Sequence, residues 1–286
     1  MIDAASRRNG ESAVNCRVPL RRVRSVLPLL LLPLLLTGCT ADTDTPGAER
    51  SNAPEESGRS TEAGTGPSAE APYAIQPDPA RLPKTRAAAL DLIGRVIADP
   101  GSFGPGVVKR NPYESGPATW AVLGTDCVWQ QRKPAAHVLA TLTRSFEVPA
   151  EAGKGPLRLA AVVTVHRTRE DAAWEMAESI EESMRCPTQH LRAGERIASL
   201  IAGALLGGEA NQNNSEDFLN ESGEYRSAEL GGPHPYAWQQ AQVLQFTVAV
   251  TGKGAKGRTA REVDTLVTQA QAAMLVRLES AVEKQN

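Results

Sequence analysis

Apolar positions recur at helical or strand spacing along the C-terminal part of the chain, and this pattern predicts helices alternating with strands. Three helices are expected where apolar residues recur every three to four positions, over 83–99, 168–185 and 259–284. Three strands are expected where apolar residues alternate, over 137–148, 157–166 and 241–251. The strand at 157–166 is apolar on both sides, which predicts a central place in a sheet.

Capping residues support two of these helices. Thr168 precedes Asp171, and Thr259 precedes Glu262, at the spacing that caps a helix start. The buried side of the helix at 168–185 is expected to consist of Ala173, Met176, Ala177, Ile180 and Met184. The buried side of the last helix is expected to consist of Val263, Val267, Ala270, Met274 and Leu278.

Weaker patterns fill the remaining stretches. Short strands are expected at 107–108, 120–122 and 224–230, an apolar helix at 194–206, and loops at 101–119 and 209–224. The strand expected at 126–131, which contains Cys127 and Trp129, belongs with the stronger predictions at 137–148 and 157–166. A turn at 152–156, rich in Gly and Pro, joins two strands as a hairpin. This order predicts an α+β fold, with helices packed on an antiparallel sheet.

The N-terminal 38 residues have a different pattern, typical of an export signal. Six arginines precede an apolar run of eleven residues, Val26–Leu36. A helix needs about 20 apolar residues to cross a bilayer, so this run is too short for a permanent span. We expect residues 1–38 to be a signal peptide for the general secretory route or, through Arg21-Arg22, for the twin-arginine route.

The apolar run ends at Leu36-Thr37-Gly38-Cys39, which looks like the lipobox of bacterial lipoproteins. Thr37 and Gly38 are small enough for a signal peptidase groove, and the thiol of Cys39 can take a diacylglyceryl group. After cleavage, the freed amine can take a further acyl chain such as palmitate, and two or more chains anchor a protein stably. We therefore expect a lipid-anchored protein on the extracytoplasmic face of the cell membrane.

Residues 39–80 are predicted to be a disordered tether. Between Thr40 and Pro72 there is no Leu, Ile, Val, Phe, Tyr or Trp. Such a stretch cannot bury enough apolar surface to offset its ordering entropy. A single globular domain is therefore expected at 81–286.

The formal net charge of the chain is −2. Loss of residues 1–38 would remove six basic and two acidic side chains and leave −6. This acidic balance predicts no nucleic-acid partner and no surface that holds anionic lipid by charge alone. Arginine outnumbers lysine 24 to 7, a usage common in GC-rich genomes, and with the lipobox it suggests an actinobacterial-type lipoprotein.

The four cysteines divide into two pairs by location. Cys16 would leave with the signal peptide, and Cys39 would be lipidated. Cys127 and Cys186 are expected to form a disulfide, because an exported domain with two cysteines usually pairs them; a catalytic thiol beside a histidine is the alternative. Two cysteines are too few for a structural zinc site, and no histidine spacing indicates a metal, so no cofactor is expected.

No motif predicts a catalytic site. The segment 252–259 matches a phosphate-binding loop except that Arg258 replaces the lysine, and a flexible basic turn before a helix cap is the favoured interpretation. Asp126 and the carboxylates of 178–182 are expected to be solvated charges rather than acid–base pairs.

The segment 231–238, Gly-Gly-Pro-His-Pro-Tyr-Ala-Trp, is the most unusual predicted loop. His234, Tyr236 and Trp238 are candidates for a recognition surface, because aromatic residues on loops often carry binding. The alternative is that they fold back into the core before the strand at 241.

Several motifs follow one another from Asp126 onward. They are Cys127-Val128-Trp129, the apolar strand at 157–166, a helix with Trp174 that leads to Cys186, Tyr236-Ala237-Trp238, and a strand before a long terminal helix. In this order they resemble a group of actinobacterial lipoproteins that are similar to the extracellular sensor domain of mycobacterial receptor serine/threonine kinases. That sensor family typically has two disulfides, whereas here only Cys127 and Cys186 can pair. The resemblance implies an α+β sandwich that binds an unknown ligand, and it supplies no catalytic residues.

These patterns favour a membrane-anchored binding or sensor module for an envelope ligand or a protein partner. Two alternatives remain open: an exported enzyme that acts on envelope material, and a structural interaction protein of a membrane complex. The enzyme is less favoured, because no motif of the sequence supplies a catalytic constellation.

Overall fold

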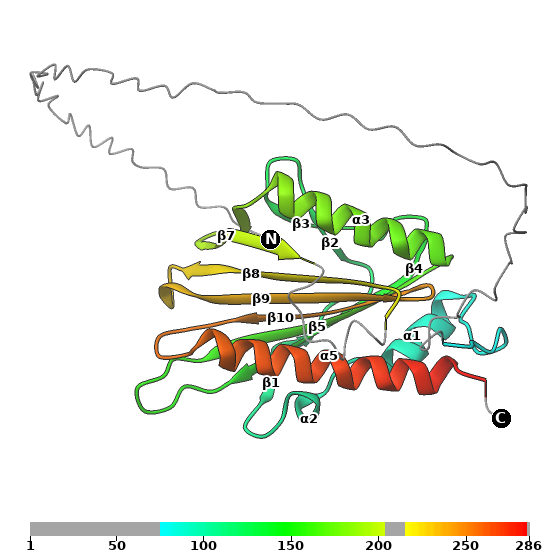
Figure 1. Cartoon of the computed structure of the whole chain (residues 1–286), viewed down its shortest axis with the longest axis horizontal. Coiled ribbons are helices and arrows are strands. Elements are labelled where there is room, and N and C mark those ends of the chain that lie inside the picture. Colours follow the sequence, from blue (N-terminus) through cyan, green and yellow to red (C-terminus); the bar gives the residue numbers. More distant parts are fainter. Residues whose placement is uncertain (1–74, 204–214, 285–286) are drawn as a thin grey trace, which may run out of the picture. The chain divides into compact units, whose positions relative to one another are not determined.

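The computed structural model describes residues 75–203 and 215–284, which all belong to one compact unit, Thr65–Asn286 (Figure 1). The predicted signal peptide, Cys39 and most of the predicted tether lie outside the described residues. The unit contains its own apolar core, its disulfide and all partners of its sheet. We therefore expect residues 65–286 to fold as an independent domain.

An antiparallel sheet of eight strands forms the centre of the unit, in the order β1-β4-β5-β10-β9-β8-β7-β6. Its strands are β1 Val108–Glu114, β4 Val138–Val148, β5 Leu157–His166, β6 Gln189–Arg192, β7 Glu195–Gly203, β8 Asp217–Ser227, β9 Gly231–Val243 and β10 Phe246–Lys253. A separate hairpin pairs β2 Trp120–Leu123 with β3 Trp129–Arg132. The predicted α+β class and the inner position of β5 are confirmed.

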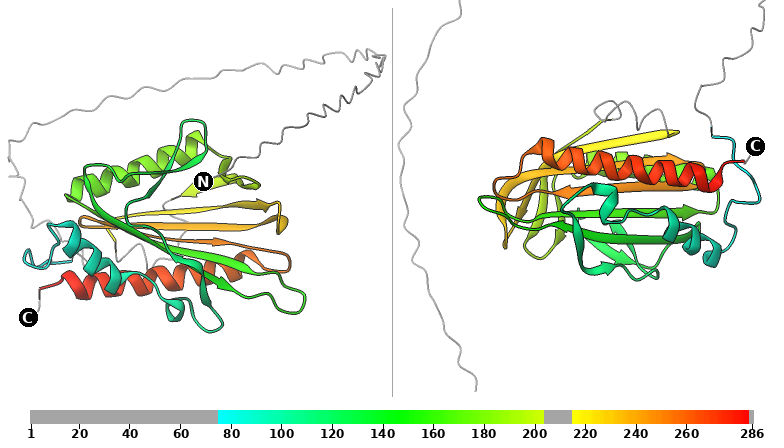
Figure 2. Two further views of the ribbon diagram at one scale, coloured as in Figure 1. Left: turned by 180° about the vertical axis from the view of Figure 1, so that it is seen from behind. Right: turned by 90° about the horizontal axis from the view of Figure 1, so that it is seen from below.

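Helices cover both faces of the sheet (Figures 1 and 2). The first face is covered by α1 Arg86–Val96, α2 Pro100–Phe103 and α5 Ala260–Val282, and the second face carries α3 Arg169–Arg185. Thr168 and Asp171 form the predicted capping box, and the Thr259 hydroxyl accepts from the backbone N–H of Glu262 as predicted.

The apolar core lies between the first face of the sheet and helices α1 and α5. Alternate residues of the central strands, such as Val163, Ala241 and Val248, are buried in this layer. All five residues predicted for the buried side of the last helix are buried there as well. The strand and helix periodicities therefore located this core correctly.

The predicted helix at 194–206 is wrong, because residues 195–203 form strand β7. The strand is irregular, because its register with β8 shifts between Ala198 and Ile201. Ile197, before the shift, is buried in a small cluster with Tyr225, whereas Ile201, after it, is exposed. Pairing with β6 and β8 satisfies the backbone of this segment. Residues 204–206 lie outside the described residues.

Other boundaries also differ from the sequence prediction. The predicted loop at 101–119 contains β1. The described part of the predicted loop at 209–224 belongs largely to β8. The predicted strand at 241–251 is divided between β9 and β10. β6 was not predicted. Leu244 has φ 53° in the tight turn between β9 and β10, a conformation that no apolar alternation indicates.

The predicted buried side of α3 is also wrong. Of the five residues proposed, only Met176 is buried, together with Ala172 and Ser183, which were not proposed. Met184 is 72% exposed and Trp174 is 63% exposed. The reason is that α3 lies over a polar face of the sheet, so the helix turns polar side chains inward.

A candidate ligand-binding groove beneath helix α3

The second face of the sheet is polar where α3 crosses it. Thr164, Thr247 and Gln240 occupy neighbouring strands β5, β10 and β9 and alternate with residues of the apolar core. Because successive side chains of a strand point to opposite faces, these polar residues all face α3. The sheet therefore has one apolar face and one face equipped for hydrogen bonding.

A groove of about 560 Å³ lies over this polar face. One wall is α3, and the other is the β2–β3 hairpin with the segment that leads into β4. We call it the α3 groove and define it by its floor, Thr141, Thr143, Val162, Thr164, Trp238, Gln240, Thr247 and Ala249, and by the wall residues Trp120, Trp129, Gln131, His137, Glu175, Glu178, Ser179 and Glu182. Concave sites with indole and a few polar groups are typical of small-molecule binding.

Glu175 organises the floor of the groove. Its carboxylate lies 2.6 Å from Nε2 of His166, and it accepts hydrogen bonds from Nε2 of Gln240 at 3.0 Å and from Oγ1 of Thr247 at 3.0 Å. The hydroxyls of Thr141 and Thr164 bond to each other at 3.1 Å. Several polar groups of the floor therefore use their hydrogen-bonding capacity within the protein.

Three indole side chains line the groove. Trp129 donates from Nε1 to the side chain of Gln189 at 2.8 Å, which fixes its ring beside the end of α3. Trp120 meets the His137 ring edge to face at 6.0 Å, and Trp238 reaches the groove from β9. Such rings offer apolar and π surface to a ligand.

Glu182 gives the groove wall a titratable group. Burial raises the pKa of this carboxyl to about 7, with the negative charges of Glu178 and Glu221 acting in the same direction and Arg185 opposing them. A carboxyl with such a pKa exchanges its proton near neutral pH and can either donate or accept a hydrogen bond. Glu182 is partly buried, whereas Glu178 and Glu181 of the same cluster are exposed.

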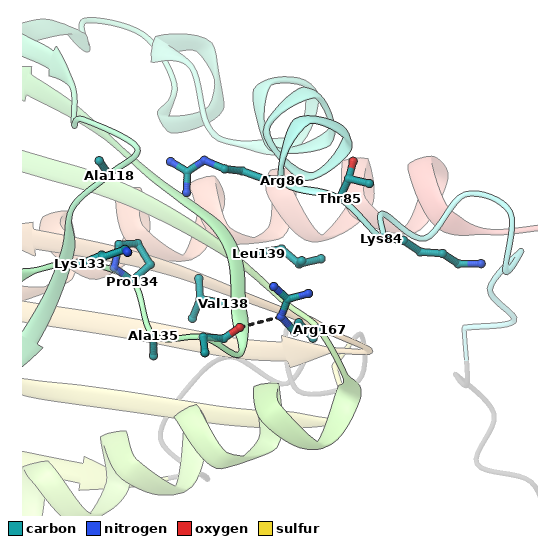
Figure 3. Close-up of a pocket in the computed structure, with 11 residues that line it drawn as sticks. Lys84, Thr85, Arg86, Ala118, Lys133, Pro134, Ala135, Val138, Leu139 and Arg167 are labelled. Carbon is teal, nitrogen blue, oxygen red and sulfur yellow. Dashed lines mark hydrogen bonds between the residues drawn. The ribbon is translucent and has the colours of Figure 1, made fainter.

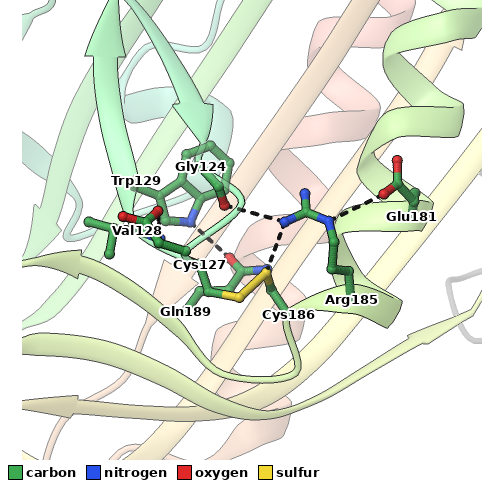
Figure 4. Close-up of a disulfide and its surroundings, with 9 residues drawn as sticks. Gly124, Cys127, Val128, Trp129, Glu181, Arg185, Cys186 and Gln189 are labelled. Atoms are coloured by element: carbon green, nitrogen blue, oxygen red, sulfur yellow. Dashed lines mark hydrogen bonds and ion pairs between the residues drawn. A yellow bond between two sulfur atoms is a disulfide. The ribbon is translucent and has the colours of Figure 1, made fainter.

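The disulfide joins the two walls of the groove (Figure 4). Cys127 lies in the β2–β3 turn and Cys186 caps the C-terminus of α3, with Cα atoms 5.6 Å apart. Arg185 reinforces this link by donating from Nη1 to the carbonyl oxygen of Gly124 at 3.3 Å. The predicted Cys127–Cys186 pair is confirmed, and its position shows that it links the β2–β3 hairpin to the end of α3.

The three candidate recognition residues lie on strand β9 rather than on the predicted loop. Trp238 lines the α3 groove, whereas Tyr236 is buried and burial raises the pKa of its hydroxyl. His234 bonds to the carbonyl oxygen of Leu230 and lines a different surface depression. The structure thus places one of the three in the groove, and the strand pairing of 231–243 explains why.

The structure shows the role of Arg258, the residue at which the segment 252–259 departs from the phosphate-binding loop pattern. Its side chain is buried, pairs with Glu151 and Glu262, and donates to the carbonyl oxygen of Gly155 at 2.9 Å. The guanidinium thus pins the β4–β5 turn to the start of α5. These contacts favour the interpretation as a basic turn before a helix cap.

The sequence prediction missed most groove residues. Their signal is the presence of Gln240, Thr164 and Thr247 within buried strands, since polar residues at alternate positions of inner strands need partners on that face. Spacing of three to four between Glu175, Glu178 and Glu182 places these carboxylates on one side of α3. Neither pattern indicates by itself that the facing helix leaves a cavity.

Within residues 75–203 and 215–284, no group of three or more His, Cys, Asp and Glu side chains is placed to hold a metal ion. The same residues contain no helix that is both long and apolar enough to cross a membrane. No protein-family model matches the chain, and no curated protein matches its sequence.

Proposed function

We propose that this protein is a lipoprotein of the extracytoplasmic membrane face whose domain binds a ligand in the α3 groove, as a binding or sensor module. The α3 groove carries this proposal, because it combines a cavity of about 560 Å³ with three indoles and a wall of carboxylates. The lipobox at Cys39 and the resemblance to receptor-kinase sensor domains support the location and the type of module.

The groove chemistry favours a ligand that has apolar surface and hydrogen-bond donors. Donors of the floor, such as Gln240 and Thr247, are engaged with Glu175. Glu178 and Glu182 on the wall offer acceptors, and the indoles offer surface for stacking. We expect hydroxylated or amine-bearing envelope compounds to bind more tightly than carboxylates of similar size.

Intrinsic tryptophan fluorescence tests ligand binding directly. Fractions of cell-envelope extract are titrated into residues 65–286, and the active compound is purified by its fluorescence change. Trp238→Leu in the groove should weaken binding at least tenfold. Trp174→Leu, on the exposed side of α3, is the matched control and should leave affinity unchanged. Equal effects of both substitutions would contradict the proposal.

Mass spectrometry of the N-terminus tests the anchor. The native protein should begin at Cys39 and carry a diacylglyceryl group, and Cys39→Ser should release the protein from the membrane fraction. Cys16→Ser, within the predicted signal peptide, should have no such effect. A mature N-terminus elsewhere, without lipid, would overturn the anchor but leave ligand binding untouched.

A further inference from the structure

A second pocket, of about 530 Å³, lies at the N-terminal end of α1 (Figure 3). It is bounded by residues 84–86, by the segment 133–139 that leads into β4, and by Arg167 at the end of β5. Lys133 and Ala135, which line the α3 groove in addition to its defining residues, are the only described residues that line both cavities. The pocket is therefore a neighbouring but separate site.

Cationic side chains dominate the charge of this pocket. Lys84, Arg86, Lys133 and Arg167 line it, and no Asp or Glu does. Among the described residues, none of these four side chains forms an ion pair, whereas nearby Arg169 pairs with Glu216 at 2.6 Å. The acidic average of the chain thus conceals a pocket lined by four cationic side chains that form no ion pair among the described residues.

Backbone carbonyls orient the two arginines. Arg86 donates from Nη2 to the carbonyl oxygen of Pro117 at 2.6 Å, and Arg167 donates from Nε to that of Ala136 at 2.6 Å. Each guanidinium retains further N–H groups for a ligand. Figure 3 shows Arg86, Lys133 and Arg167 on separate segments around the pocket, while the Lys84 side chain extends away from them along the rim.

The start of α1 adds to the positive potential. The helix has 11 residues and begins beside the pocket, where Thr85 caps the backbone N–H of Ala88. The positive end of a helix dipole favours an anion at this position. Guanidinium groups and a helix N-terminus together suit the tetrahedral oxygens of a phosphate.

We propose that this pocket binds a phosphate group, carried either by an anionic phospholipid headgroup or by a soluble phosphate compound. The pocket lies early in the domain: Lys84 follows Ile75, the first described residue, by nine positions, and 35 residues separate Ile75 from Cys39. A chain of 35 residues spans at most about 120 Å, so a lipid on Cys39 would keep the pocket within reach of headgroups. The proposal does not depend on a ligand in the α3 groove.

The binding test uses residues 65–286 without a lipid anchor. Co-sedimentation is measured with vesicles of phosphatidylcholine alone and with vesicles that contain phosphatidylglycerol, and glycerol 3-phosphate is titrated by calorimetry. Binding to phosphatidylglycerol vesicles alone identifies a headgroup site. Binding of glycerol 3-phosphate, with competition against the vesicles, identifies a site for soluble phosphates as well. Absence of binding in both arms overturns the proposal.

Charge-neutralising variants locate the site. Arg86→Gln with Arg167→Gln should weaken binding about 25-fold, since each Lys or Arg near an anionic surface contributes roughly a factor of five. Lys84→Gln with Lys133→Gln breaks no hydrogen bond among the described residues. A loss of binding in this variant can therefore not be attributed to misfolding. Arg95→Gln with Arg261→Gln removes the same charge elsewhere and should change affinity less than twofold. An equal loss of affinity in this control would show that the membrane or phosphate is attracted by the overall charge of the domain, and it would overturn the pocket as the binding site.

Discussion

The Nε2 atom of His166, at the end of β5, lies 2.6 Å from the carboxylate of Glu175 on α3. The His166 side chain is fully buried, and its ring stacks on that of His137 with centroids 5.8 Å apart. One carboxylate thus ties the helix to the floor of the α3 groove. Glu175 holds the position of α3 through polar contacts where most helices use apolar ones.

Removal of this carboxylate should destabilise the domain. Glu175→Ala leaves the buried donors on Gln240 and Thr247 without their acceptor, which costs about 1–3 kcal/mol for an unsatisfied group. We expect a loss of about 2 kcal/mol or more in urea unfolding. Glu178→Ala, at an exposed position of the same helix, should change stability by about 0.5 kcal/mol at most. Similar losses in both variants would refute this role of Glu175.

The outcome for α3 shows what hydrophobic periodicity can and cannot predict. The start of α3 follows from Thr168 and Asp171, which act within one helix turn. The direction of the buried side depends on the facing sheet, and here that sheet presents Thr and Gln. A stripe of apolar residues in the sequence therefore predicted the helix but not the side that it buries.

Paired substitutions on α3 test this orientation. Met176→Ala should cost about 2–5 kcal/mol because Met176 is fully buried. Met184→Ala should cost about 0.5 kcal/mol or less because Met184 is exposed. Chemical unfolding of both variants measures the difference. A larger loss of stability from Met184→Ala than from Met176→Ala would support the orientation of α3 that the sequence pattern predicted.

The limits of sequence prediction are similar for the strands. β5 follows directly from its apolar alternation, whereas polar residues and two prolines mask β9, and the apolar residues of β7 favoured a helix. Their pairing is set by long-range partners, such as β8 between them, and a local pattern contains no information on these. For the same reason the α3 groove, whose lining comes from distant segments, was largely missed.

Loss of the disulfide should loosen the hairpin wall of the groove. Cys127 and Cys186 are 59 positions apart, and the chain-entropy model assigns a loop of that size about 4 kcal/mol of stability. Cys127→Ser with Cys186→Ser should reduce the unfolding free energy by up to that amount. Amide exchange should accelerate most in β2 and β3, which lie outside the main sheet.

A reductant provides the control for the disulfide. Wild-type domain treated with dithiothreitol should match the double-serine variant in stability, and the variant itself should not respond. Unchanged amide exchange in β2 and β3 after reduction would show that contacts such as Trp129–Gln189 hold the hairpin without the disulfide.

Glu182 should make stability depend on pH near neutrality. Burial raises the pKa of Glu182 from 4.5 to about 7 in the folded domain. The folded state then binds more protons than the unfolded state between these values, so stability falls as the pH rises from about 5 to 7. Glu182→Gln should therefore raise the melting temperature at pH 8 and have little effect at pH 4. The exposed Glu181→Gln is the control, and an equal response of both variants would refute the shift.

The buried carboxylate of Glu195 should have the opposite pH dependence. Glu195 on β7 lies 3.0 Å from Arg158 and 3.5 Å from Lys253, and it also pairs with Arg192. Although burial acts to raise its pKa, Arg192 and Lys253 outweigh burial and lower the pKa of Glu195. This carboxylate neutralises cations that the sheet otherwise buries.

Glu195→Gln should accordingly be among the most damaging substitutions on the second face of the sheet. It removes the buried partner of the Arg158 guanidinium, which keeps its ion pair with Glu229, so the cost of about 3–5 kcal/mol for a broken buried pair is an upper limit. Because the folded pKa of Glu195 is lowered, its contribution is present above about pH 4.5 and is lost on acidification, so variant and wild type should converge in stability at low pH. Glu229→Gln breaks the other ion pair of Arg158 at a side chain that is 67% exposed and should change stability much less than Glu195→Gln, because solvent screens an exposed pair. Urea unfolding of the wild type and the two variants at pH 7 and pH 3.5 measures these losses of stability. A pH-independent loss in Glu195→Gln would point to packing rather than charge.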